Sequence, residues 1–360
     1  MQVVLSLAPG GTERLVVDLV NRLRPELPMA VCCLDEAGSW GESLQRDDVR
    51  VTALRRQDGF RPALGRAIAR AAAEHGARVL HCHQYSPFVY ASIARLWSPQ
   101  LQIVFTEHGR LSDAPPSAKR RTANRVLAHA PRTVVTVSSE LKRHLVAEGF
   151  PSERVSVIYN GIDVGAPPDA QARARVRREL GLSDREIVVG TIARLDPVKD
   201  LQTLVRAIAE PTSAPLTLLV IGDGPERAGL EAAARSRSLT GSVRFLGHRD
   251  DARSLLAACD LYANSSISEG ISLTILEAMA ARVPVVATRV GGTPEIVDES
   301  CGRLVPSRDA RALAAMLSAL AGDPQLRAGL GRAARARVEE RFTLERMIRE
   351  YRDAYYTAVA

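Results

Sequence analysis

The sequence has few aromatic and cysteine residues. Its 360 residues include two Trp, seven Tyr and six Phe, too few to supply the stacking surfaces that hold single-stranded nucleic acid. The net charge of +7 therefore points to small molecules that carry phosphate. The five cysteines are odd in number and irregularly spaced, which argues against a disulfide framework and indicates reduced thiols in a cytosolic protein.

Signals for membrane insertion and secretion are also missing. No apolar run approaches the ~20 residues that a membrane-spanning helix needs. The beginning of the sequence has neither the basic segment nor the cleavage site of a signal peptide. We therefore expect a cytoplasmic protein that contacts the inner face of the plasma membrane peripherally, if at all.

A chain of this length exceeds the size at which one core keeps growing, so two domains are expected. Short apolar segments alternate with helical ones, which is typical of parallel sheets covered on both faces. Residues 162–170 are rich in Pro and Gly, break this alternation and are expected to form a linker. The expected strands are 3–7, 29–33, 49–54, 79–82, 103–106, 133–137, 155–159, 187–193, 216–221, 243–246, 261–263, 283–287 and 303–305.

The most informative stretch runs from position 268 to 281 and carries two carboxylates, Glu269 and Glu277, eight positions apart. Ser272 is the expected N-cap of the helix that follows. The free amides of a helix start suit a phosphate group, and carboxylates suit sugar hydroxyls. The alternative is that both glutamates are ordinary solvated charges.

Two cations, Arg194 and Lys199, lie five positions apart in a loop that Pro197 prevents from being the middle of a helix. The loop Gly222-Asp223-Gly224 follows the next expected strand. It could begin a dinucleotide fingerprint, but position 227 is Arg instead of Gly, so a dehydrogenase loses its main support.

Histidines end two expected strands. His81 and His83 would point to one face of a strand; metal binding is one interpretation, but no third ligand stands at a suitable spacing, and strand-end residues lining a cleft are the other. His108 follows Glu107 at the end of another strand. It could be structural or could reach a ligand.

The densest basic run contains Lys119, Arg120 and Arg121, followed by Arg125. Residues 1–165 hold 21 Lys and Arg against 16 Asp and Glu, so most of the positive excess lies in this half. A solvated helix face, recognition of an acceptor phosphate and contact with an anionic membrane all remain open.

Taken together, the motif from Glu269 to Glu277, the Ala-Met-Ala that follows Glu277 and the apolar 284–288 segment resemble the donor site of family 4 retaining glycosyltransferases. Within that family the chain is similar to bacterial exopolysaccharide or capsule transferases of group 1. The resemblance implies a GT-B fold, an α/β architecture of two Rossmann-like, doubly wound parallel-sheet domains facing a cleft. The implied parts are an acceptor-binding domain (1–165), a nucleotide-sugar-binding domain (166–342) and a C-terminal helix that crosses back to the first domain (343–360).

The resemblance also implies roles for single residues. Arg194 and Lys199 match the diphosphate clamp, and Glu277 the residue that holds the ribose. Glu269 would hold the donor sugar, and His108 would contact it from the other domain; His108, Glu269, Arg194 and Lys199 are the expected catalytic set. The remaining donor contacts are expected at Gly11, Gly222, Gly224, His248, Gly270, Ile271, Ser272 and Leu273, and the acceptor contacts at Lys119, Arg120 and Arg121.

The implied activity is metal-independent transfer of a sugar, with retention, from a nucleoside-diphosphate sugar to an acceptor hydroxyl in polysaccharide or glycoconjugate synthesis. The donor, expected to be a UDP-sugar, is a co-substrate, so no cofactor is expected. No metal is expected because the sequence has no Asp-X-Asp. The expected acceptor is a sugar or a lipid-linked molecule, and no nucleic acid is involved. A sugar-nucleotide 2-epimerase of the same fold and a non-catalytic nucleotide-sugar-binding protein are the alternatives.

The chain departs from the family pattern at two positions. Ser272 stands where many members have a second glycine, and Arg282 stands where glycine usually ends the helix. A left-handed residue there would cost an arginine roughly 1 kcal/mol, so we expect this turn to differ.

Overall fold

The computed structural model describes residues 1–109, 118–212 and 214–360, without the side chain of Lys119. It divides into two compact units, one formed by Met1–Asn160 with Glu345–Ala360 and the other by Gly161–Leu344. The C-terminal helix therefore belongs to the first unit.

The first unit contains a parallel seven-stranded sheet of order β3-β2-β1-β4-β5-β6-β7. In its register, Val3 of β1 lies between Cys32 of β2 and Cys82 of β4. The strands are β1 (Gln2–Val4), β2 (Ala30–Cys33), β3 (Arg50–Ala53), β4 (Val79–His83), β5 (Gln102–Glu107), β6 (Thr133–Thr136) and β7 (Val155–Val157). The helices are α1 (Gly11–Leu23), α2 (Gly38–Arg46), α3 (Ala63–Glu74), α4 (Tyr85–Ala94), α5 (Ala118–Leu127), α6 (Ser139–Ala147), the 3-10 turn η1 (Ser152–Arg154) and α15 (Leu344–Val359).

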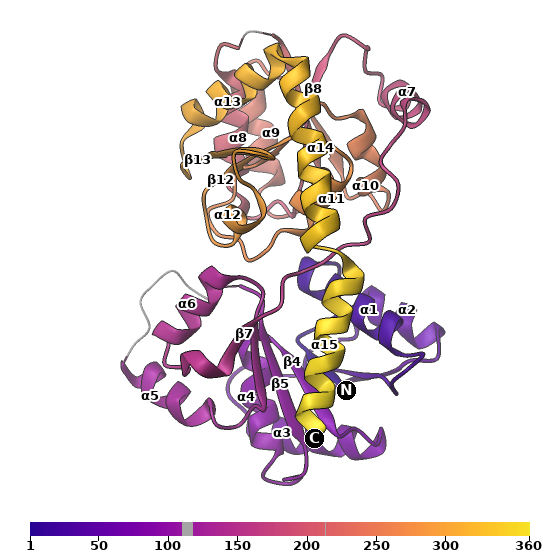
Figure 1. The fold of residues 1–360 in the computed structure, drawn as a ribbon, viewed down its shortest axis with the longest axis vertical. Helices are drawn as coiled ribbons and strands as arrows, with labels where there is room; N and C mark the ends of the chain where they lie inside the picture. Colours follow the sequence, from indigo (N-terminus) through magenta and orange to yellow (C-terminus); the bar gives the residue numbers. More distant parts are fainter. Residues whose placement is uncertain (110–117, 213) are drawn as a thin grey trace. The chain divides into compact units, whose positions relative to one another are not determined.

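Helices cover this sheet because its strands are apolar on both sides. Phe88 of α4 stacks on Phe105 of β5 with ring centroids 4.4 Å apart, and Phe150 packs on the same pair. Helix α15 runs beside the strands of this unit (Figure 1), and Tyr355 on it contacts His81 of β4. Helix α15 is thereby tied to the central strands of this sheet through polar side chains.

The second unit contains a parallel six-stranded sheet of order β10-β9-β8-β11-β12-β13. Its strands are β8 (Ile187–Ile192), β9 (Leu216–Ile221), β10 (Val243–Gly247), β11 (Leu261–Asn264), β12 (Val285–Thr288) and β13 (Gly302–Val305). Its helices are α7 (Ala170–Glu179), η2 (Pro197–Lys199), α8 (Leu201–Ala209), α9 (Arg227–Ser236), α10 (Ala252–Leu255), η3 (Leu256–Ala258), α11 (Leu273–Ala280), α12 (Thr293–Ile296), α13 (Ala310–Gly322) and α14 (Pro324–Arg341).

In both sheets the strand order reverses at one place. In each, the first strand of the unit lies beside the fourth: β1 beside β4, and β8 beside β11. This is the doubly wound order in which ligands bind outside the carboxyl ends of the two strands at the switch. The predicted α/β class with two Rossmann-like sheets is confirmed, and each expected strand overlaps an observed one.

The turn after α11 contradicts one expectation. Arg282 adopts the left-handed conformation, with φ +62°, so the turn keeps the usual shape despite the missing glycine. Helix α14 fits against it through Gly331, where a Cβ would lie 2.1 Å from the Arg282 carbonyl oxygen. The close approach of α14 keeps the turn in this shape, and Arg282 adopts the strained left-handed conformation.

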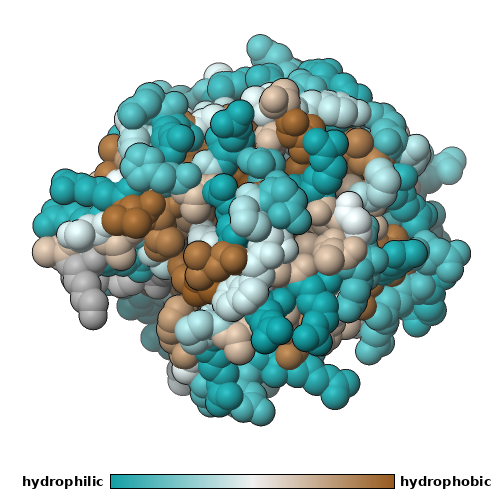
Figure 2. Space-filling view, turned by 90° about the horizontal axis from the view of Figure 1, so that it is seen from below, coloured by the Kyte–Doolittle hydropathy of each residue, from teal (hydrophilic) through white to brown (hydrophobic). Residues whose placement is uncertain are grey.

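Among the described residues, no helix is both long and apolar enough to cross a membrane. Figure 2 shows one face of the molecule, on which hydrophobic residues form separate patches among hydrophilic ones. The most exposed large apolar side chains are Leu96, Val126 and Phe60.

Candidate functional site

In the second unit, charged side chains gather at the switch between β8 and β11. Lys199 comes from the loop after β8, and Glu269 from the loop after β11. The Lys199 Nζ atom lies 2.7 Å from Glu269 Oε1, and the side chains are 25% and 8% exposed. The structure thus joins two predicted site residues that are 70 positions apart.

Two neighbours of Glu269 fix its carboxylate. Ser266 donates from Oγ to Glu269 Oε1 at 2.6 Å, and Asn264 donates from Nδ2 to the same oxygen at 3.2 Å. Ser265 donates to the Lys199 carbonyl at 2.9 Å, which ties the two loops together. Among the described residues, no hydrogen bond reaches Glu269 Oε2, so this is the oxygen that can meet a ligand hydroxyl.

The backbone around Glu269 leaves no room for a side chain at Gly291. Gly291 has φ +51°, and a Cβ there would lie 1.8 Å from the Glu269 carbonyl oxygen. Gly292 donates its amide to the same oxygen at 3.2 Å. The glycine pair after β12 therefore sets the position of the loop that carries Glu269.

Helix α11 follows that loop, with Ser272 as its N-cap as predicted. The Ser272 hydroxyl accepts from the Ile275 amide at 3.4 Å. Leu273 is the first helical residue, and Gly270 and Ile271 precede the cap. The amides of this stretch therefore lie at the N-terminus of the helix, where unpaired N–H groups attract anions. Glu277 lies one turn further along, on a half-buried position.

The loop after β9 packs on the loop after β8. A Cβ at Gly222 would meet the Ala193 carbonyl oxygen at 1.9 Å, and one at Gly224 would meet that of Leu195 at 2.5 Å. Both glycines have positive φ, so both the space and the conformation require glycine. Arg194 lies in the segment they contact, but its side chain is 74% exposed and comes only within 3.9 Å of Asp196.

His248 follows β10, at the edge of the sheet. Its ring is 65% exposed, and Nε2 lies 3.3 Å from Asp250 Oδ1. The structure thus leaves two predicted donor residues, Arg194 and His248, turned to solvent, while it brings Lys199 and Glu269 together.

In the first unit, the carboxyl ends of β4 and β5 bring histidines together. His83 Nδ1 lies 2.9 Å from His108 Nε2, and the two rings stack with centroids 5.1 Å apart. Burial lowers the pKa of His108 to about 3 and raises the pKa of Glu107 to about 8, despite amide donors from Gly109 and His108. Gly11 begins α1 after the neighbouring β1, and a Cβ there would meet nothing within 4 Å.

The basic run lies on α5. Arg120 is already engaged: it pairs with Glu148 at 2.9 Å and lies over the Tyr85 ring at 4.7 Å from the centroid. Arg121 is exposed. The side chain of Lys119 lies outside the described residues.

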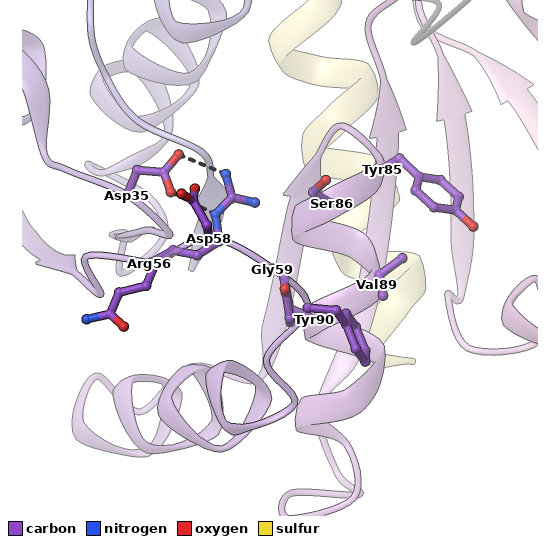
Figure 3. Close-up of a pocket in the computed structure, with 10 residues that line it drawn as sticks. Asp35, Arg56, Asp58, Gly59, Tyr85, Ser86, Val89 and Tyr90 are labelled. Atoms are coloured by element: carbon purple, nitrogen blue, oxygen red, sulfur yellow. Dashed lines mark hydrogen bonds and ion pairs between the residues drawn. The ribbon is translucent and has the colours of Figure 1, made fainter.

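A cavity of about 710 Å³ opens at the carboxyl edge of the same sheet. It lies between the segment after β3 and the start of α4, which itself follows His83 (Figure 3). Arg56 makes two hydrogen bonds to Asp35, at 2.8 and 3.1 Å. Phe60 stacks on Tyr90 with centroids 5.6 Å apart. The cavity thus combines an aromatic wall with carboxylates.

Among the described residues, no three His, Cys, Asp or Glu side chains are arranged to hold a metal ion. His81 and His83 bond instead to protein groups, with Thr106 and Gln2 among their partners.

Comparison with known proteins assigns the fold to a family. The model described as Glycosyltransferase Family 4 matches residues 9–166, and that described as Glycosyl transferases group 1 matches residues 186–323. N-acetyl-alpha-D-glucosaminyl L-malate synthase of Bacillus anthracis is 30% identical over 301 residues, which cover 82% of this chain and 78% of that protein. The chain belongs to glycosyltransferase family 4. As a group 1 glycosyltransferase it transfers a sugar from a nucleotide sugar.

Other proteins are similar to this chain as well. D-inositol 3-phosphate glycosyltransferase of Salinispora arenicola is 34% identical over 264 residues, which cover 68% of this chain and 59% of that protein. Among solved structures, HepE of Anabaena in complex with UDP and glucose has a TM-score of 0.88 at 25% identity, covering 99% of this chain and all of that one. The likeness to the HepE structure confirms the predicted GT-B fold class.

Sequence reasoning missed several polar residues that contact the predicted site residues or their neighbours. The contacts of Asn264 and Ser266 with Glu269 were not predicted, although a polar run at the end of an apolar strand is a signal for site residues. Gln2 and Tyr355 are 353 positions apart, and no spacing rule connects them.

Proposed function

We propose that this glycosyltransferase works without a metal and with retention, and uses a UDP-sugar in the synthesis of a bacterial polysaccharide or glycoconjugate. The observation that carries the proposal is the Lys199–Glu269 pair at the switch of the second sheet. It supplies a fixed cation and a carboxylate at the place where a doubly wound sheet binds its ligand. The names of the HepE complexes, with UDP and with UDP and glucose, support the choice of base.

The cations act on the leaving group. As the bond between the sugar and the diphosphate breaks, its electron pair moves onto the diphosphate oxygen, and negative charge grows there. Lys199, held by Glu269, is already in place to stabilise that charge, so little reorganisation is needed. Arg194, exposed beside the Gly222–Gly224 loop, would turn toward a bound diphosphate and complete the clamp.

The carboxylates hold the two sugars of the donor. Glu269 Oε2 would accept from a hydroxyl of the transferred sugar, and Glu277 from the ribose. The amides from Gly270 to Leu273 would face the diphosphate. The acceptor oxygen then attacks the face from which the diphosphate leaves and gives up its proton to that departing oxygen, which preserves the anomeric configuration.

The cavity of the first unit is the proposed acceptor site. Its charged lining residues are Asp35, Arg56 and Asp58, so carboxylates outnumber cations there. Two relatives are named for anionic molecules, L-malate and inositol 3-phosphate. A cavity with excess negative charge and an exposed Phe60 instead favours a neutral sugar, stacked on the ring.

A comparison of acceptors tests this. We expect Phe60→Ala to raise KM for a neutral saccharide acceptor about tenfold and to leave the donor KM unchanged. Asp58→Lys should improve a phosphorylated acceptor relative to its neutral counterpart. Better use of phosphorylated than of neutral acceptors by the wild type would contradict a neutral acceptor site.

Peripheral membrane contact is part of the proposal. Arg121, Arg125 and Val126 are exposed on α5, and each basic residue near an anionic surface adds about 1 kcal/mol. Binding to vesicles containing phosphatidylserine should fall in Arg121→Gln/Arg125→Gln. Equal binding of wild type and variant would exclude this helix as the contact.

The activity itself is tested by incubating the protein with several nucleotide sugars and an acceptor. We expect nucleoside diphosphate release, and a product whose anomeric proton coupling matches that of the donor. Inverted product would exclude retention. Epimerised nucleotide sugar formed without an acceptor would identify a 2-epimerase.

A further inference from the structure

A chain of buried polar side chains links α15 to His108 within the first unit. His108 Nε2 lies 2.9 Å from His83 Nδ1, and His83 Nε2 lies 2.7 Å from Gln2 Oε1. The other end of the Gln2 amide, Nε2, donates to the Tyr355 hydroxyl at 3.1 Å. Four residues, two on strands, one directly after a strand and one on a helix, therefore form a continuous hydrogen-bonded line.

The histidines of this line are neutral. Burial lowers the pKa of His108 to about 3 and that of His83 well below its usual value. Each ring therefore carries one N–H, which donates, and one bare nitrogen, which accepts. The position of a proton on one ring then decides its position on the next.

The Gln2 amide sets the direction of the line. Its oxygen faces His83, and 2.7 Å suits an N–H···O bond, so His83 carries its proton on Nε2. His83 Nδ1 is then bare and must accept from His108 Nε2–H. By the same logic His108 Nδ1 is bare.

The far side of the line agrees with this direction. The Tyr355 hydroxyl accepts from Gln2, so its own proton is free to donate to His81 Nδ1 at 2.6 Å. His81 Nε2–H can then donate to Thr106 Oγ1 at 2.8 Å. If the Gln2 amide were rotated so that its oxygen and nitrogen exchanged places, donor and acceptor would exchange in each of these bonds.

His108 Nδ1 is the open end. It is buried, and none of the described residues donates to it. A buried acceptor without a partner costs about 1–3 kcal/mol, which a ligand that donates a hydrogen bond would recover.

We propose that Gln2, His83 and Tyr355 are positioning residues that hold His108 in the Nε2–H tautomer, so that Nδ1 accepts a hydrogen bond from a hydroxyl of the transferred sugar. The second half rests on the proposed function together with the family resemblance, which implies that His108 contacts the transferred sugar; the tautomer does not. A bare nitrogen at this point selects a donor with a hydroxyl there and rejects one in which the hydroxyl is missing.

Nitrogen-15 NMR of histidine-labelled, full-length protein reads the tautomers directly. We expect His108 and His83 each to show a protonated Nε2 and an unprotonated Nδ1 at neutral pH. A protonated Nδ1 on His108 in the wild type would overturn the proposal without any variant.

Substitution tests the line itself. Gln2→Met keeps the shape and removes both hydrogen bonds, so His108 should populate both tautomers. We expect kcat to fall about two- to tenfold, the worth of one net hydrogen bond, with the KM of the acceptor unchanged. Tyr355→Phe should act in the same direction and more weakly, whereas Tyr356→Phe, on the exposed side of α15, should change nothing.

A purely structural role would lower the melting temperature of Gln2→Met and leave the His108 tautomer as in the wild type, and that result overturns the proposal. Deoxy donors separate the two halves. The wild type should turn over more slowly with the donor that lacks the hydroxyl bound by His108 Nδ1 than with the intact donor. In Gln2→Met the same change of donor should lower the rate less. Correct tautomers with no turnover of any nucleotide sugar would refute the proposed function while the hydrogen-bonded line stands.

Discussion

Replacing Lys199 tests whether a fixed cation drives departure of the diphosphate. Lys199→Met removes the charge and keeps most of the side-chain volume. A unit charge about 4 Å from the growing negative charge is worth about 1 kcal/mol in water and about 4 kcal/mol near a protein surface. The Lys199 side chain is 25% exposed, which places it between these limits. A loss of about 2–3 kcal/mol corresponds to a thirty- to 150-fold lower kcat.

The assay is release of nucleoside diphosphate at saturating donor, with the melting temperature measured in parallel. That second measurement is needed because Glu269, 8% exposed, loses its counter-charge and keeps only the donors Ser266 and Asn264. Lys199→Arg should retain most of the rate, and Lys142→Met on α6 serves as a matched lysine control. In Lys199→Ala, which leaves space, ethylammonium should restore part of the rate.

A folded Lys199→Met protein that releases diphosphate within threefold of the wild-type rate would refute this reasoning. So would a large loss in Lys142→Met, because that lysine lies in the other unit.

Three further predictions concern the supporting structure. Gly291→Ala should lower the melting temperature and raise the donor KM, because its Cβ would collide with the Glu269 carbonyl; an unchanged KM would show that this loop does not place Glu269. Arg282→Gly should stabilise the protein by up to about 1 kcal/mol by relieving the left-handed strain, and denaturant unfolding that gives a lower stability would contradict it. Glu107, with its pKa raised to about 8, binds a proton in the folded state that it loses when unfolded, so stability should fall as pH rises from about 4.5 to 8, by up to about 1.4 kcal/mol per pH unit. Glu107→Gln should remove that slope, and a slope identical to wild type would assign it to other groups.

The strands could be predicted from the sequence because each is a short apolar run buried on both faces. Strand order was implied only by the family resemblance. Nothing local in β8 or β11 shows that they are neighbours, and their pairing is what brings Lys199 to Glu269. The N-cap at Ser272 was predictable because capping is a local interaction. The shape of the turn at Arg282 was not, because it depends on Gly331 of a helix far along the chain.

The candidate site shows the same division. Charged residues after strands stood out in the sequence, and their roles in binding the donor stay predictions. The groups that orient them, such as Asn264 beside Glu269 or Tyr355 beside Gln2, carry no periodic pattern, since they meet only once both partners are folded.

The most direct test of the central claim is a single turnover of the wild-type protein with its nucleotide sugar in the presence of excess chelator. If side-chain cations alone neutralise the departing diphosphate, its release should proceed at the same rate with and without chelator. Loss of release that added Mg²⁺ or Mn²⁺ restores would contradict the account.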